Sequence, residues 1–185
     1  MALEVDGQPW RTVPDEVVAT CGLAAGVDLD RPLLRRLRGE LRRAEALDAA
    51  ARALARRPLS HERLRERLRR QGVRPPAERE AVATLDRLGL VDDARLAAER
   101  ARALARRGWG DAAIVARLEA EGLAQELVAR ALAELEPEQD RAARLAETSG
   151  DPRTSWKLLA RRGFSLEAIE AALGALDEGV PGGLG

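Results

Sequence analysis

The stretch ARALARRGWGDAAIVARLEAEGLAQELVARALAEL (residues 101–135) decides the fold, because it predicts three short helices in succession. Gly108 and Gly110 flank Trp109, and glycine is the usual residue where a helix ends in a left-handed conformation. Asp111 is placed to cap the following helix, since its carboxylate can accept hydrogen bonds from unpaired amides. Apolar side chains then recur at helical spacing, with a glycine between the last two helices: Ile114, Leu118, Gly122, Val128, Leu132 and Leu135.

The same pattern occurs twice more in the chain. A shift of 50 residues towards the N-terminus places its apolar and glycine positions on Leu54, Leu64, Leu68, Gly72 and Val73. A shift of 41 residues towards the C-terminus places them on Leu145, Leu159, Gly163, Phe164, Ile169, Leu173 and Leu176. These spacings are typical of helical repeats. The sequence therefore predicts an all-α protein of tandem three-helix repeats that form an elongated, curved molecule.

Five segments are expected along the chain. They are an N-terminal accessory element with the start of a long helix (1–43), three three-helix repeats (44–90, 91–136 and 137–178) and a disordered tail (179–185). Asp6-Gly7 lies between loosely alternating apolar residues, which indicates a small β-hairpin in the accessory element. The tail is rich in glycine and contains a proline, a composition that favours disorder.

A long helix is predicted over residues 31–57, with Asp30 and Pro32 at its start and Gly39 as a candidate interruption. Its near-heptad leucines with arginines between them also fit a coiled coil or a helix lying on a membrane surface. Pro58 soon breaks the pattern, which argues against a coiled coil. The apolar face contains no Trp or Phe, which argues against a membrane anchor.

The formal net charge is zero, but the charges are unevenly distributed. Residues 31–74 contain 15 arginines and five carboxylates, a net charge of +10, whereas residues 1–30 and 75–185 each have a net charge of −5. Lys157 is the only lysine. Arginine has a planar fork of donors that suits phosphate and carboxylate groups. The basic segment fits an anionic partner, but a genome-wide preference for Arg and Ala codons explains most of the choice of arginine over lysine.

The residues needed for common catalytic sites are largely missing. His61 is the only histidine and Cys21 the only cysteine, so neither a zinc site nor a Cys–His nucleophile pair can be assembled. No glycine-rich phosphate loop is present, and Asp92-Asp93 fits a helix cap better than a metal site. Ser60 is likewise placed to cap the helix that follows it. We predict a protein that is not an enzyme and binds no cofactor or metal.

Cellular location follows from other features of the sequence. The N-terminus has no secretion signal, no stretch is apolar enough to span a membrane, and the single cysteine fits a reducing compartment. We expect a cytoplasmic protein that does not contact membranes and is a monomer.

The candidate partner contacts are mainly arginines near helix ends. Arg63, Arg67 and Arg70 form an i, i+4, i+7 row, with no equally dense acidic row opposite it, which fits a phosphate backbone or an acidic protein groove. The full predicted set is Arg63, Arg67, Arg69, Arg70, Arg106, Arg107, Trp109, Arg117, Arg161 and Arg162. The alternative is a structural role, because cations near a helix C-terminus are mildly stabilising. Trp109 is either a lid over the junction of three helices, which we favour, or an exposed interface anchor.

Three stretches resemble the RecX family of bacterial recombination regulators. They are ALARRPLSHERLRERLRRQGV (53–73), GLVDDARLA (89–97) and RRGWGDAAIVARLEAEGL (106–123). Their order and spacing follow the family pattern, and the resemblance extends over about residues 44–177. One departure is RPPAERE (74–80), which is longer than the family's usual second turn.

The resemblance implies a non-catalytic protein of three-helix repeats that binds the RecA recombinase. Members of the family bind in the groove of the RecA–DNA filament and restrain its growth, ATP hydrolysis, strand exchange and co-protease activity, which connects them to DNA repair, recombination and the SOS response. DNA contact is then weak or made through the filament. The rival hypothesis is a general DNA-binding helical module in DNA repair, which predicts tight, salt-sensitive binding to naked DNA.

Overall fold

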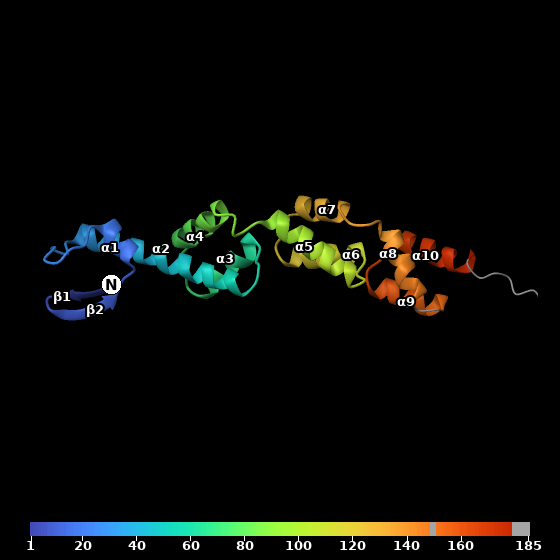
Figure 1. Cartoon of the computed structure of the whole chain (residues 1–185), viewed down its shortest axis with the longest axis horizontal. Helices are drawn as coiled ribbons and strands as arrows, with labels where there is room; N and C mark the ends of the chain where they lie inside the picture. Colours follow the sequence, from blue (N-terminus) through green and yellow to red (C-terminus); the bar gives the residue numbers. More distant parts are fainter. Residues whose placement is uncertain (149–150, 179–185) are drawn as a thin grey trace, which may run out of the picture. The chain divides into compact units, whose positions relative to one another are not determined.

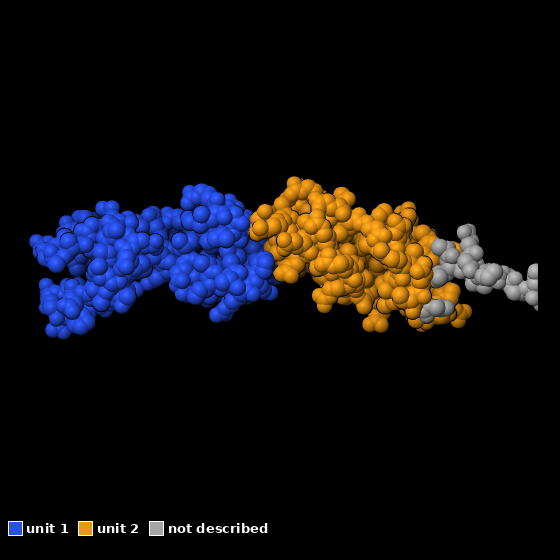
Figure 2. All heavy atoms as spheres, in the orientation of Figure 1, with its two compact units in different colours: residues 1–91 blue, residues 92–185 orange. Residues whose placement is uncertain are grey.

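A computed structural model of the chain describes residues 1–148 and 151–178, with the side chains of the last helix described through Gly174. The predicted tail (179–185), the turn residue Gly150 and the side chain of Leu176 lie outside the described residues. The chain divides into two units, Met1–Val91 and Asp92–Gly185, which Figure 2 colours separately.

The first unit begins with two strands and continues with four helices. The elements are β1 (Ala2–Val5), β2 (Gln8–Thr12), α1 (Asp15–Cys21), α2 (Arg31–Arg56), α3 (His61–Arg70) and α4 (Pro75–Arg87) (Figure 1). The strands pair antiparallel. Asp6 and Gly7 have φ angles of 51° and 74°, the left-handed pair that a tight type I′ hairpin turn needs. The predicted hairpin is confirmed. Gly39 does not interrupt α2, which continues for 26 residues.

The second unit consists of two successive groups of three helices. The first group is α5 (Asp93–Arg106), α6 (Asp111–Ala120) and α7 (Gln125–Ala133); the second is α8 (Glu138–Glu147), α9 (Pro152–Arg161) and α10 (Leu166–Glu178) (Figure 1). The all-α fold of three-helix repeats with a small N-terminal hairpin is therefore confirmed.

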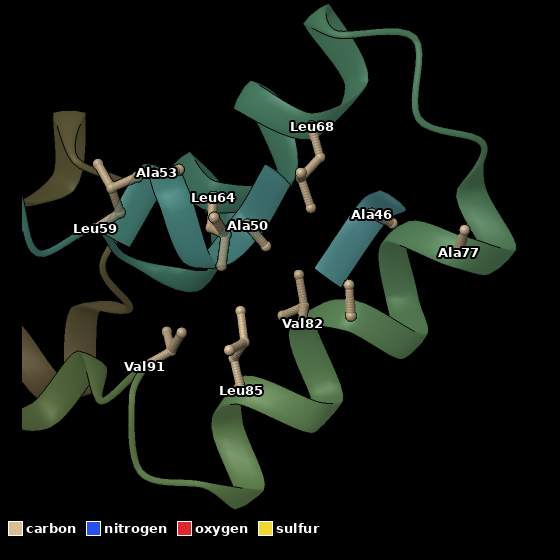
Figure 3. Packing of buried hydrophobic residues seen from close by; sticks show 11 residues of the cluster. Ala46, Ala50, Ala53, Leu59, Leu64, Leu68, Ala77, Val82, Leu85 and Val91 are labelled. Carbon is tan, nitrogen blue, oxygen red and sulfur yellow. The ribbon is translucent and has the colours of Figure 1, made fainter. Parts of the chain in front are cut away.

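Each group of helices has its own apolar core. In the first repeat, small alanines on α2 let α3 and α4 pack closely, and Figure 3 shows leucine and valine side chains pointing towards them. This core contains Ala46, Ala50, Ala53, Leu59, Leu64, Leu68, Ala77, Ala81, Val82, Leu85 and Val91. The N-terminal half of α2 packs instead on the hairpin and α1, through Leu37 and Leu41. One long helix therefore joins the accessory element to the first repeat.

The second helix of every repeat ends in the same turn. Gly72, Gly122 and Gly163 have φ angles of 78°, 76° and 78°, which strain any residue with a Cβ atom. The amide after each glycine donates to a carbonyl five residues earlier, with N···O distances of 3.1, 3.2 and 3.2 Å for Val73→Leu68, Leu123→Leu118 and Phe164→Leu159. This arrangement is a Schellman cap, which satisfies the last carbonyls of the helix.

Several predicted helix starts are also present. The side chain of Ser60 accepts a hydrogen bond from the amide of Arg63 (3.1 Å), and that of Asp92 accepts one from the amide of Arg95 (2.9 Å). Each bond satisfies one of the amides that a helix N-terminus leaves unpaired. The caps of α3 and α5 are confirmed.

Gly39 gives a prediction about stability. A Cβ atom built at this position would meet nothing within 4 Å, so no internal contact requires a glycine in the middle of α2. We expect Gly39→Ala to raise the free energy of unfolding by about 0.5–1 kcal/mol, the usual difference between the two residues inside a helix. Urea denaturation followed by circular dichroism measures the change, and a less stable variant would contradict the expectation.

Candidate partner-binding site

The ten predicted contact residues lie in both units. Arg63, Arg67, Arg69 and Arg70 are on α3 in the first unit, and the other six are on or beside α5, α6 and α9 in the second. The two groups differ in how their charges are paired within the chain.

The arginine row on α3 has a carboxylate partner within its own helix. Glu66 lies on the same helix; Arg63 donates to it at 2.8 Å, and Arg70 forms an ion pair with its other oxygen. These bonds, that from Arg63 above all, hold the pKa of Glu66 below its usual value. No acidic row of equal density lies opposite these arginines, but a single glutamate, three residues after Arg63 and four before Arg70, reaches both.

Arg69 is held by the first unit itself. Its guanidinium donates two hydrogen bonds, of 3.1 and 3.2 Å, to the two carboxylate oxygens of Glu78 on α4. The side chain of Glu78 is only 4% exposed, so it needs a cationic partner. The hydrogen bonds to Glu78 raise the pKa of Arg69 above its ordinary value. Arg69 therefore joins α3 to α4.

In the second unit, two arginines lie over the ring of Trp109. The guanidinium carbon of Arg117 on α6 is 3.6 Å from the centre of the indole ring, and that of Arg162 at the end of α9 is 4.8 Å from it. Both distances allow cation–π attraction. The indole is half-buried and packs on the core of the second repeat, which fits the lid that we favoured. Arg162 also donates to the backbone oxygen of Arg107 (2.8 Å).

A close backbone contact brings these residues together. The amide of Gly110 donates to the carbonyl of Arg162 (2.9 Å), and the amide of Ala112 donates to the carbonyl of Gly163 (3.2 Å). A Cβ atom on Gly110 would overlap the backbone of Gly163 and Phe164. Gly110 itself has a φ of −79°, so the predicted left-handed stop applies to Gly108 (φ 74°) and not to Gly110. Gly110 is needed because another backbone occupies the space of its side chain.

Two residues of α8 strengthen this contact. Arg141, whose side chain is 5% exposed, donates to the backbone oxygen of Trp109 (2.9 Å) and forms an ion pair with Asp111. Glu138 accepts hydrogen bonds from the amide of Asp111 (2.6 Å) and from the hydroxyl of Ser165 (2.6 Å). The prediction that Asp111 caps its own helix is therefore wrong, because its carboxylate binds Arg141 and Glu138 supplies the acceptor. In sequence, Glu138 and Arg141 look like ordinary residues of a helix start.

We call the group Arg106, Arg107, Trp109, Arg117, Arg161 and Arg162 the Trp109 corner. Among the residues that the structure describes, no carboxylate forms an ion pair with any of its five arginines. Arg162 and Arg117 each donate one hydrogen bond to a backbone oxygen, at Arg107 and Ala113, which leaves most of their donors unused. The corner can therefore bind carboxylate or phosphate groups beside an aromatic ring.

Other kinds of site are not apparent in the described part of the chain. It contains no group of three or more His, Cys, Asp or Glu side chains placed to hold a metal ion. A separate search of the same residues finds no helix both long and apolar enough to cross a bilayer. A groove of about 480 Å³ lies between α1, α2 and α4, but its Arg43 already pairs with Glu40 and Glu80.

Curated relatives identify the class of protein as a regulator built from helical repeats. Proteins named "Regulatory protein RecX" are 33% identical to the chain over 141 residues in Halorhodospira halophila and 35% identical over 135 residues in Chromohalobacter salexigens. The first alignment covers 71% of this chain and 88% of the relative; the second covers 68% and 89%. The chain belongs to the RecX family. No protein-family model matches it.

Solved structures agree with this fold. A crystal structure of a regulatory protein RecX superposes with a TM-score of 0.75 at 19% identity, covering 91% of this chain and 90% of that one. The RecX structure from Lactobacillus salivarius superposes with a TM-score of 0.68 at 20% identity, covering 74% of this chain and 97% of that one. The fold is therefore kept at low sequence identity.

A pair of glycine variants tests the backbone contact. Gly72 and Gly163 share a φ of 78°, but a Cβ atom at Gly72 meets nothing within 4 Å, whereas one at Gly163 would lie 2.7 Å from the Cβ atom of Ala113. We expect Gly72→Ala to lower the free energy of unfolding by about 1–2 kcal/mol through left-handed strain. Gly163→Ala should lower it by about 1–3 kcal/mol more through overpacking.

Urea denaturation of the full chain, followed by circular dichroism, measures both glycine variants. Gly72→Ala serves as the control for backbone strain alone. Equal losses in the two variants would contradict the close contact between the two turns.

Proposed function

We propose that this chain is a non-catalytic regulator that binds the RecA recombinase on DNA and restrains its ATPase, strand-exchange and co-protease activities. Membership of the RecX family supports a regulatory role. The three stretches that resemble the family (53–73, 89–97 and 106–123) support RecA as the partner, because that resemblance implies RecA binding. The protein would act in the cytoplasm as a monomer, in DNA repair, recombination and the SOS response.

The single observation that carries the mode of binding is the unpaired charge of the Trp109 corner. Five arginines at the ends of α5 and α9 and on α6 have no carboxylate partner among the described residues. Such a surface attracts an acidic protein groove or the phosphates within it, and it does so over a distance of about 10 Å at moderate salt. Tryptophan and arginine are also the residues that most often dominate protein interfaces.

The rigidity of the corner supports the same role. The backbone bonds between Gly110 and Arg162, and the buried Arg141, hold the helix ends in place before any partner arrives. A preformed site loses less side-chain freedom on binding, so more of the contact energy appears as affinity. The corner offers donors and an aromatic ring but no nucleophile with a base, which fits binding and not catalysis.

The row on α3 is the weaker candidate for this contact. Glu66 already pairs with Arg63 and Arg70, so a partner would have to displace bonds within the helix. Its role in binding stays a prediction from the sequence. Repeats that each add a weak contact would still bind a filament strongly through multivalency.

Charge reversal tests the proposed function. Arg106 and Arg161 are exposed and take no part in the bonds that hold the corner together, so Arg106→Glu with Arg161→Glu should leave the fold intact. We expect the concentration needed for half-inhibition of the RecA ATPase on DNA to rise about tenfold, which corresponds to about 1.4 kcal/mol.

The matched control for the charge reversal is Arg63→Glu with Arg70→Glu, which changes the charge by the same amount on the paired row. It should shift the inhibition curve less. An unchanged curve for the corner variant, with a normal circular dichroism spectrum, would remove the Trp109 corner from the mechanism.

A further inference from the structure

A second row of arginines lies on the N-terminal half of α2. Arg31, Arg35, Arg38 and Arg42 follow one another at intervals of four, three and four residues. At 3.6 residues per turn, these positions lie within about 60° of one another around the helix, and they span roughly 16 Å along it. All four residues are exposed. They form a straight line of positive charge, which we call the α2 row.

The α2 row differs from its neighbours in having no internal partner. Among the described residues, no hydrogen bond or ion pair joins any of its four side chains to another group of the chain. The arginines that face the packed elements are engaged instead: Arg36 donates to the backbone oxygen of Thr20, and Arg43 pairs with Glu40 and Glu80. Arginines on α2 are therefore paired or unpaired according to the side of the helix that they occupy.

The nearest acid beyond the α2 row is also occupied. Glu45 continues the line by three residues, and Arg11 on β2 donates to it at 2.7 Å. The hairpin therefore engages a carboxylate that would otherwise continue the line of the row. Gly39 lies beside the row and contributes no side chain, although no internal contact requires a glycine there. A partner can thus approach the helix backbone closely at this point.

The form of the α2 row indicates the kind of partner. A straight, evenly spaced line of guanidinium groups matches a stiff chain of evenly spaced phosphates, each of which arginine can bind through two donors. Another side of α2 is buried through Leu37 and Leu41, which are 0% and 3% exposed, so only the exposed side that carries the row can meet a partner. The exposed side carries no Asn or Gln that would read bases. The regular line of the row therefore fits the nucleic-acid backbone better than a set of base edges.

We propose that the α2 row binds the phosphate backbone of duplex DNA without reading its sequence. The row lies within residues 1–43, before the region that resembles the RecX family, and it is separate from the Trp109 corner in the second unit. This binding needs no recombinase, and the proposal does not rest on the proposed function. It assigns direct DNA contact to the accessory element.

A membrane surface fits the α2 row less well. Helices that lie on membranes insert apolar side chains next to their cations. Here the adjacent Leu33 packs against the core formed with α1 and the hairpin, and Leu34 beside it is half-buried. An acidic protein would not require the regular line that the row presents.

Salt-dependent binding of the full chain to a fluorescently labelled DNA duplex tests the proposal. The variant Arg35→Gln, Arg38→Gln, Arg42→Gln removes three positive charges from exposed positions. Each lost phosphate contact lowers the slope of log K against log salt by about 0.9, so we expect the slope to fall by about 2–3. Affinity at low salt should fall at least tenfold. Fluorescence anisotropy at four salt concentrations measures both quantities.

The control for the DNA test is Arg63→Gln, Arg67→Gln, Arg70→Gln, which removes the same charge from α3 and should leave the slope nearly unchanged. Equal losses in both variants, or no binding of the unaltered chain to the duplex at low salt, would overturn the proposal. So would binding to anionic phospholipid vesicles or to polyglutamate that is as tight as binding to DNA and is lost in the α2 variant.

The two proposals fail in different ways. Arg106→Glu with Arg161→Glu should weaken inhibition of RecA while keeping at least part of the duplex binding that the α2 row provides. The α2 variant should lose duplex binding whether or not the chain inhibits RecA. A salt slope that falls in the corner variant and not in the α2 variant would move the DNA contact to the second unit and overturn the assignment to α2.

Discussion

The contact between the backbones of Gly110 and Gly163 is the constraint on which the Trp109 corner depends. Two turns approach so closely that neither glycine can gain a Cβ atom without overlapping its neighbour. Hydrogen bonds from Gly110 and Ala112 fix the register, and this register places Arg162 on the ring of Trp109. The second and third repeats are therefore joined by a direct backbone contact, and the position of Arg162 follows from it.

The three basic surfaces of this chain differ mainly in whether their arginines pair with carboxylates of the same chain, and not in how many arginines they contain. The row on α3 has Glu66 within reach of two of its members. The α2 row and the Trp109 corner have no such partner among the described residues. Exposed ion pairs contribute little to stability, but they lower the charge that a partner meets. A chain with zero net charge can thus present two strongly basic surfaces.

The buried polar residues of the chain serve its internal joints. Glu78 and Arg141 are 3% and 6% exposed, and each has a partner of opposite charge, Arg69 and Asp111. Breaking a buried pair costs far more than forming it contributes, because the remaining charge is left without water or partner. Such pairs therefore specify which helices pack together. This matters in a protein with alanine-rich cores, because small side chains interlock less specifically than large ones.

Local signals in the sequence determined much of this protein. The repeat of apolar and glycine positions, the Asp-Gly hairpin turn and the caps at Ser60 and Asp92 depend on residues close together in the chain, and each is present in the structure. Only the tertiary structure decided the role of Gly110, the partner of Asp111 and the contact of Arg162 with the ring of Trp109. Each depends on residues about 30 to 55 positions away, namely Glu138, Arg141, Arg162 and Gly163. Periodicity reports which face of a helix is buried, but not which distant helix end arrives there.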